Sequence, residues 1–194
     1  IGTQMITKGF AFGNVNFVGV IRADSLLNFP DFRAHEKAFQ LLTQVSGRAG
    51  RRQEQGKVFI QSFQPEHQIL QNVTTYSYAP TMKDILYERK EFLYPPFSRL
   101  IKLRFKHKNK ERLDKTAEQL VVLLKASFES RCLLGPEAPS IGRINNLYIT
   151  DVMIKILPKQ SPQKVKELIQ AKIDQLNTIA AFRSVRIDVD VDPV

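Results

Sequence analysis

The sequence is poor in cysteine and contains no long apolar run. Its only cysteine, Cys132, can form neither an internal disulfide nor a cysteine zinc site, so we expect a small, half-buried strand residue in a reducing compartment. No apolar run approaches the roughly 20 residues that a membrane-spanning helix needs, so no membrane partner is expected. There is no G-x-x-x-x-G-K-[ST] loop. The three histidines are scattered along the chain, and we predict no metal site.

What the sequence does contain is apolar residues and positive charge. Apolar residues make up 43% of the 194, enough for a packed core in one large domain or two small ones. The net charge of +10 is uneven: residues 1–97 hold 11 Lys/Arg against 8 Asp/Glu, and residues 98–194 hold 18 against 11. This excess suits a polyanion partner such as DNA, although it also suits any basic soluble protein.

The clearest break along the chain is Tyr94-Pro95-Pro96-Phe97, because paired prolines end a helix and force extended backbone. We therefore predict two domains, 1–94 and 95–194. The first alternates strands and helices in series, which is typical of a parallel α/β sheet, with too few strands for a complete lobe. Its predicted elements are strands at Val15–Ile21 and Val58–Ser62, and helices at Phe32–Ser46, Glu66–Thr74 and Pro80–Phe92, with residues 1–5 expected to end a further strand.

The second predicted domain has a more regular pattern. An alternating strand surrounds Leu103, and helical spacing follows from Leu113 to Phe128. Extended segments then flank the turn signal Asn145-Asn146, and a second helix begins at Ser161-Pro162. A last alternating strand runs from Val185 to Val191. The order β-α-β-β-α-β predicts an α+β domain of the split-βαβ, ferredoxin-like layout.

The strongest motif is Gln44-Val45-Ser46-Gly47-Arg48-Ala49-Gly50-Arg51. Arg48 and Arg51, three apart after a predicted helix, would present guanidinium groups on one side, where they can match phosphate oxygens or stabilise a transferring phosphoryl group. The same arginines could simply complement the negative end of the helix dipole. The spacing alone leaves both interpretations open.

These residues resemble motif VI of superfamily 2 helicases, and Gly2-Thr3-Gln4-Met5-Ile6-Thr7-Lys8-Gly9 resembles motif V in the form found in the PriA family. Further segments are similar to that family in order along the whole chain. They are Asp31-Phe32-Arg33-Ala34 with Glu36, Glu88-Arg89, Tyr94-Pro95-Pro96-Phe97, Leu134-Gly135-Pro136, Ala138-Pro139 with Ile141 and Arg143, and Asp188-Val189-Asp190-Val191-Asp192-Pro193. The chain is thus identified as the C-terminal part of such a protein, holding half of the second motor lobe and the domain after it, and we expect Ile1 to lie inside a longer sequence.

The resemblance implies an ATP-dependent helicase that moves 3′ to 5′ on DNA, recognises forks and D-loops, and restarts replication in the bacterial cytoplasm. Partners would be single-stranded DNA-binding protein and primosome proteins. ATP and Mg²⁺ would be bound mainly by a first lobe, and zinc by an upstream insertion, neither of which is in this chain. Arg51 and Arg48 would be the catalytic arginines, with Gln44 and Gly47 also at the nucleotide, and Thr3, Gln4 and Lys8 toward DNA. The chain alone is expected to lack ATPase activity.

A second candidate DNA surface follows from periodicity. Lys102, Arg104, Lys106 and Lys108 alternate with apolar residues, so one strand face would carry positive charges at roughly 7 Å spacing. The alternative is a solvated outer face of an antiparallel sheet. Asp188, Asp190 and Asp192 alternate in the last strand and predict either a cation site or an exposed polar face. Lys164 and Lys166 could contact a partner protein.

Two other functions stay open at this stage. A ferredoxin-like nucleic-acid-binding module without a motor role would explain the charge but would make the motif VI match a coincidence. Another superfamily 2 translocase, directed at RNA, would share motif VI. The Tyr94-Pro95-Pro96-Phe97 and Asp190-Val191-Asp192-Pro193 segments resemble the PriA family instead.

Overall fold

The computed structural model describes residues 17–47 and 56–193. Contacts divide the chain into two compact units, residues 1–88 and 89–194. The division falls within helix α4 (Tyr78–Glu91), a few residues before the predicted boundary at residue 94. No helix in the described part of the chain is both long and apolar enough to cross a membrane.

The first unit is built on two parallel strands, β1 (Phe17–Val20) and β2 (Lys57–Ile60), with Val18 opposite Val58. This parallel pair is the arrangement that the strand–helix–strand order predicts. The helices are α1 (Asp24–Leu27), α2 (Ala34–Ser46), α3 (Gln68–Thr74) and α4. β1 ends one residue and β2 two residues before the predicted ends, and α1 was not predicted.

The core of the first unit forms where α2 packs against α3 and the strands. In α2, Ala38 and Leu42 are buried, whereas the other apolar residues Leu41 and Val45 are only half-buried. Phe39 of the same helix is also buried. The buried face of α2 is therefore rotated toward Phe39, because the nearby Ile69 and Val73 of α3 cover that side.

The second unit contains one antiparallel sheet in the order β4-β6-β3-β7, with the short β5 also paired to β6. Its elements are β3 (Arg99–His107), α5 (Lys110–Lys125), a 3₁₀ turn (Ser130–Cys132), β4 (Leu133–Glu137), β5 (Arg143–Ile144), β6 (Leu147–Ile156), α6 (Pro162–Asn177) and β7 (Arg186–Val191). Apart from β5 and the 3₁₀ turn, this is the predicted β-α-β-β-α-β order of an α+β domain.

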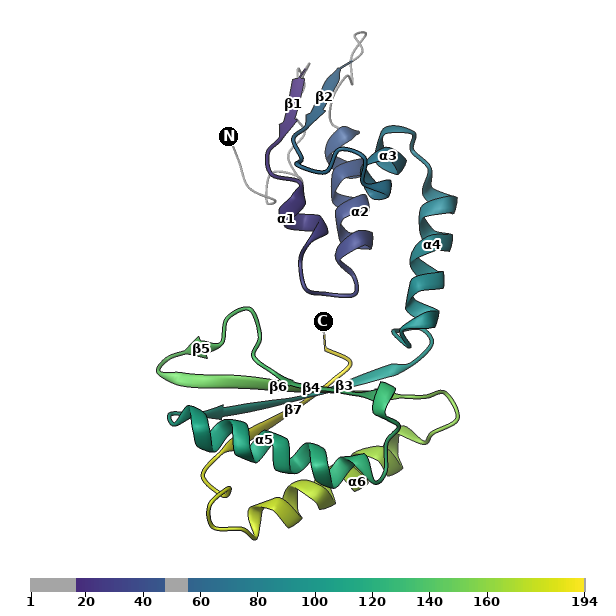
Figure 1. The fold of residues 1–194 in the computed structure, drawn as a ribbon. Coiled ribbons are helices and arrows are strands. Elements are labelled where there is room, and N and C mark those ends of the chain that lie inside the picture. The colour runs from purple at the N-terminus through teal and green to yellow at the C-terminus, as the bar shows by residue number, and fades with distance from the viewer. Residues whose placement is uncertain (1–16, 48–55, 194) are drawn as a thin grey trace. The chain divides into compact units, whose positions relative to one another are not determined.

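One face of this sheet is covered by both helices, α5 and α6 (Figure 1). Ile101, Leu103 and Phe105, the predicted apolar face of β3, are fully buried there. Leu120 of α5 and Leu176 of α6 pack into the same core. Burying such side chains contributes roughly 1.5–3 kcal/mol each, so this interface supplies much of the stability of the second unit.

The turn signal Asn145-Asn146 and the helix start Ser161-Pro162 are both found in the structure. Asn145 and Asn146 have φ of 48° and 63° and join β5 to β6 in a tight hairpin. Helix α6 begins with Pro162 in its first turn, as predicted. Ser161 precedes it at the N-cap, but its side chain makes no capping hydrogen bond. In α5, by contrast, the Asn109 side chain accepts a hydrogen bond from the Arg112 amide at 2.8 Å.

Candidate functional site

The end of α2 carries the described part of the predicted nucleotide site. Gln44 lies in the last turn and is exposed, and Gly47 follows the helix as its C-cap. The Gly47 amide donates to the Thr43 carbonyl at 3.0 Å, with φ of −69°, so the turn itself does not require glycine. The carbonyl end of the helix dipole favours cations in the residues that follow.

The predicted residues Arg48, Arg51, Thr3, Gln4 and Lys8 lie outside the described residues. Their roles toward nucleotide and DNA therefore stay predictions that follow from the resemblance. Among the described residues, the structure places Gln44 and Gly47 next to each other at one exposed helix end, directly before Arg48 in the chain.

Two carboxylates near α2 have structural partners. Asp31 accepts hydrogen bonds from the Arg33 amide at 2.9 Å and from Lys37 Nζ at 2.8 Å, which fixes the entry into α2. These bonds outweigh desolvation and hold the pKa of Asp31 below its ordinary value. Asp24, at the start of α1, accepts from the Ser62 hydroxyl at 2.8 Å and so ties α1 to the chain after β2. Both acids are thus explained by local structure.

Two of the histidines lie close together in space. His35 of α2 and His67 before α3 have ring centroids 5.3 Å apart, and His35 Nδ1 is 3.6 Å from a Glu88 carboxylate oxygen. Burial lowers the pKa of His67, and the neighbouring His35 lowers it further. Within the described ranges, no group of three or more potential ligands could hold a metal ion. Sequence separation hid this contact, and the structure gives it no metal-binding role.

The basic residues of β3 do share one sheet face, opposite the helices, but carboxylates neutralise them. Arg104 pairs with Asp151 of β6 at 2.7 Å, and Lys106 pairs with Asp188 of β7 at 2.8 Å. Lys102 lies 3.6 Å from Asp190 of β7. The side chains of Lys102, Arg104 and Lys106 are only 21%, 32% and 28% exposed, so these cations are partly covered as well as paired.

This pairing also explains the alternating acids of β7. Asp188 and Asp190 face the lysines of β3, and Asp192 pairs with Arg99. The carboxylates are thus committed to ion pairs, which removes the basis for the predicted cation site. Lys108 lies beyond the end of β3 and is exposed, without a carboxylate partner in the described part of the chain. The four cations predicted as one DNA surface are therefore three paired residues and one free lysine.

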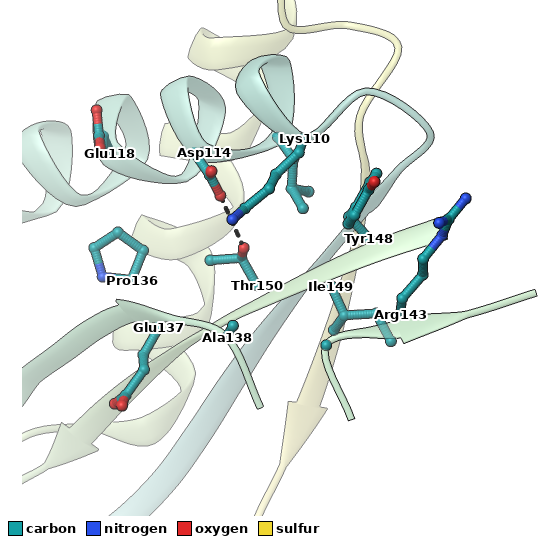
Figure 2. Close-up of a pocket in the computed structure, with 12 residues that line it drawn as sticks. Lys110, Asp114, Glu118, Pro136, Glu137, Ala138, Arg143, Tyr148, Ile149 and Thr150 are labelled. Atoms are coloured by element: carbon teal, nitrogen blue, oxygen red, sulfur yellow. Dashed lines mark hydrogen bonds between the residues drawn. The ribbon is translucent and has the colours of Figure 1, made fainter. Parts of the chain in front are cut away.

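A pocket of about 600 Å³ lies beside this sheet, where β4 leaves β6 and before β5 rejoins it. Figure 2 shows Lys110, Asp114 and Glu118 projecting from α5, with Pro136, Glu137 and Ala138 from the end of β4 across from them. Asp114 accepts a hydrogen bond from the buried Thr150 hydroxyl at 3.2 Å.

The rim of this pocket combines charge of both signs with an aromatic ring. The Arg143 guanidinium lies 4.9 Å from the centroid of the Tyr148 ring, a geometry that allows a cation–π contact. Sequence reasoning did not find the pocket, because its residues come from three segments that only the fold brings together.

Taken together, the strand order and the two helices on one sheet face define an α+β domain of the split-βαβ layout. Residues 90–194, more than half of the chain, match the profile of the primosomal protein N C-terminal domain, so the chain belongs to that family. This match begins next to the division found from contacts.

Relatives named replication restart protein PriA are similar to the entire chain. Those of Synechocystis and Bacillus subtilis are each 39% identical over 100% of this chain, which covers 22% and 24% of their lengths. The relative of Haemophilus influenzae is 32% identical over 100% of this chain and 26% of its own length. The chain thus spans about a quarter of the length of these curated relatives, and the resemblance to the PriA family is confirmed.

Proposed function

We propose that this chain is the C-terminal portion of an ATP-dependent 3′-to-5′ DNA helicase that recognises stalled forks and restarts replication. The observation that supports this most is the full-chain similarity to proteins named replication restart protein PriA. The first unit would be part of the second motor lobe, and residues 89–194 would be the domain that follows it. The protein would act in the bacterial cytoplasm.

In this proposal the chain contributes the far wall of a nucleotide site. Arg51 and Arg48 would contact the phosphates of ATP, with Mg²⁺ held mainly by a first lobe outside this chain. Gln44, exposed at the end of α2, would link the state of the nucleotide to the motor cleft. The carbonyl end of α2 carries partial negative charge, which favours cations in the residues that follow.

The test is the replacement Arg51→Ala in the complete protein. An arginine that stabilises the transferring phosphoryl group is worth about 10³–10⁵ in turnover, so ATP hydrolysis should fall by at least about a thousandfold while DNA affinity changes little. Arg52→Ala is the matched control, since Arg52 directly follows the last residue of the motif and is not part of it. Unchanged turnover in Arg51→Ala would remove the assignment.

The DNA surface would include Thr3, Gln4 and Lys8 together with the exposed Lys108. Lys102, Arg104 and Lys106 of β3 would join it only where phosphates displace their carboxylate partners. The partners would be forks, D-loops and single strands, with single-stranded DNA-binding protein and primosome proteins. Since no triphosphate-binding loop occurs in the sequence, the chain alone should hydrolyse no ATP. DNA-stimulated hydrolysis by purified residues 1–194 would contradict this.

The second candidate, a nucleic-acid-binding module without a motor role, is favoured only by the split-βαβ order of the second unit. It predicts that nucleic-acid binding is fully retained when residues 1–88 are deleted. The motor proposal predicts that this deletion abolishes unwinding.

A further inference from the structure

Lys155 is a buried cation without a buried anion. It lies on β6 opposite Leu100, on the sheet face away from the helices, and only 3% of it is exposed. In the described ranges no carboxylate pairs with it. Its Nζ donates to the Phe92 carbonyl at 2.5 Å and lies 3.9 Å from the centroid of the Tyr94 ring. A carbonyl and an aromatic face are therefore its partners, both from one segment of the chain.

Holding a cation here is costly. Removing an ammonium group from water costs several kcal/mol unless partners compensate, and burial lowers the pKa of Lys155. The neighbouring Cys132 acts in the opposite direction and raises the pKa of Lys155, but burial is the larger effect. An apolar side chain of similar length would fill this space without that cost. Packing alone therefore does not account for a lysine at this position.

The two partners of Lys155 belong to residues 92–98, which we term the connector, between the end of α4 and the start of β3. Other bonds give the connector one conformation: the Tyr94 amide donates to the Arg89 carbonyl at 2.7 Å, and the Ser98 hydroxyl donates to the Leu93 carbonyl at 2.6 Å. Leu93 has φ of 52°, where a non-glycine residue is uncommon. Lys155 attaches this folded connector to the middle strand pair of the sheet.

The connector continues directly from α4, whose other end belongs to the first unit. Thr81 and Ile85 of α4 are buried, and Ile85 is part of the core formed with α2 and α3. The connector is therefore the covalent path along the chain from α4 to β3. Without an attachment, a loop of this kind would absorb a displacement of α4 by local rearrangement.

We propose that Lys155 is a positioning residue that ties the connector to β6, so that movements of the motor lobe are delivered to the C-terminal domain. This inference rests on the proposed helicase function. A hydrogen bond to a main-chain carbonyl and a contact with a ring face restrain the backbone of Phe92 and the side chain of Tyr94 at the same time. A lysine can make both contacts at once, whereas a methionine of similar length can make only the second, and more weakly.

The test replaces Lys155 with Met in the complete protein and counts base pairs unwound per ATP hydrolysed. Elements that transmit coupling modulate it by about 0.5–2 kcal/mol, so this ratio should fall about fivefold, while DNA-stimulated ATP hydrolysis and DNA affinity stay within about twofold. Hydrogen exchange should show faster exchange at the Tyr94 and Phe97 amides. The control Lys159→Met removes an exposed lysine from the turn after β6 and should change none of these values.

The outcomes separate the inference from the function on which it rests. If the unmodified protein does not unwind DNA, the proposed function fails first. If it does, and Lys155→Met unwinds as many base pairs per ATP, the positioning role is wrong. If Lys155→Met does not fold, Tyr94→Leu carries the same test, since it removes the ring face and leaves the lysine in place. Normal coupling in that variant overturns the inference.

Discussion

Arg104 and Asp151 face each other directly across β3 and β6, and the guanidinium donates two hydrogen bonds to one carboxylate. Nε reaches Oδ1 at 2.8 Å and Nη2 reaches Oδ2 at 2.7 Å. The bond to Asp151 raises the pKa of Arg104 more than burial lowers it. Strand β7 supplies Asp188 and Asp190 from the other side. The basic row of β3 is therefore a set of cross-strand ion pairs and not a free cationic surface.

The first prediction concerns Asp151→Asn, which releases Arg104 from its carboxylate. Because the pair is bidentate but its side chains are 32% and 20% exposed, the free energy of unfolding should fall by only about 1–2 kcal/mol. If the β3 face contacts DNA, single-strand affinity should rise severalfold at low salt, since one more cation becomes available to phosphates. Fluorescence anisotropy over a salt series measures this.

Asp174→Asn in α6 is the matched control, because it removes the same charge at an exposed site away from this face. Equal affinity changes in both variants would mean that only net charge matters. No change in either would argue against the β3 face as a DNA surface.

A second prediction concerns Gly135, at which β4 begins to leave β6. Its φ is +97°, and a Cβ there would lie 2.7 Å from the Asp151 carbonyl oxygen. Gly135→Ala should therefore lower the free energy of unfolding by about 2 kcal/mol or more, since neither the backbone conformation nor the close approach is tolerated. Chemical denaturation of the purified chain provides the measurement.

Gly142→Ala serves as the comparison, since its added Cβ would meet atoms only at 3.8 Å. It should be close to neutral. Equal losses at both positions would show that the conformation at Gly135 is not the cause.

Helix α5 provides a third prediction about the core. Leu120 is fully buried between α5 and the sheet, whereas Val122 on the same helix is 58% exposed. Leu120→Ala should cost about 2–5 kcal/mol through lost burial and the cavity left behind. Val122→Ala should be near neutral or slightly stabilising, because alanine favours a helix more than valine does. A small effect at Leu120 would contradict the assigned packing of α5.

The fourth prediction concerns acid. Ion pairs with Lys106 and Arg186 hold the pKa of Asp188 below its ordinary value of 3.8, and Asp31 and Asp192 are lowered likewise. A carboxyl group whose pKa is lowered by folding stabilises the fold fully at pH values above its pKa in the unfolded chain. It loses that contribution as the pH falls through its pKa in the folded chain. Stability should therefore decline below about pH 4. The decline should be shallower in Asp188→Asn, and an unchanged slope would contradict the role of this pair.

Much of the second unit could be predicted from local pattern. The alternation around Leu103 identified both faces of β3, and the spacing from Leu113 onward identified the buried side of α5. Asn145-Asn146 identified a hairpin turn. The candidate nucleotide site was predicted only as a motif: Gln44 lies exposed at a helix end, and Arg48 and Arg51 lie outside the described residues, so the site stays a prediction.

By itself the sequence determined the order of the main elements, the faces that β3 and α5 present to the core, and the family to which the chain belongs. Those features depend on periodicity and turn chemistry among neighbours in the chain, which sequence carries directly. Only the tertiary structure decided that the cations of β3 are neutralised, that a pocket opens between β4 and β5, and that Lys155 is buried under Tyr94. Each of these depends on the register between strands distant in sequence, and a shift of one residue would exchange every partner.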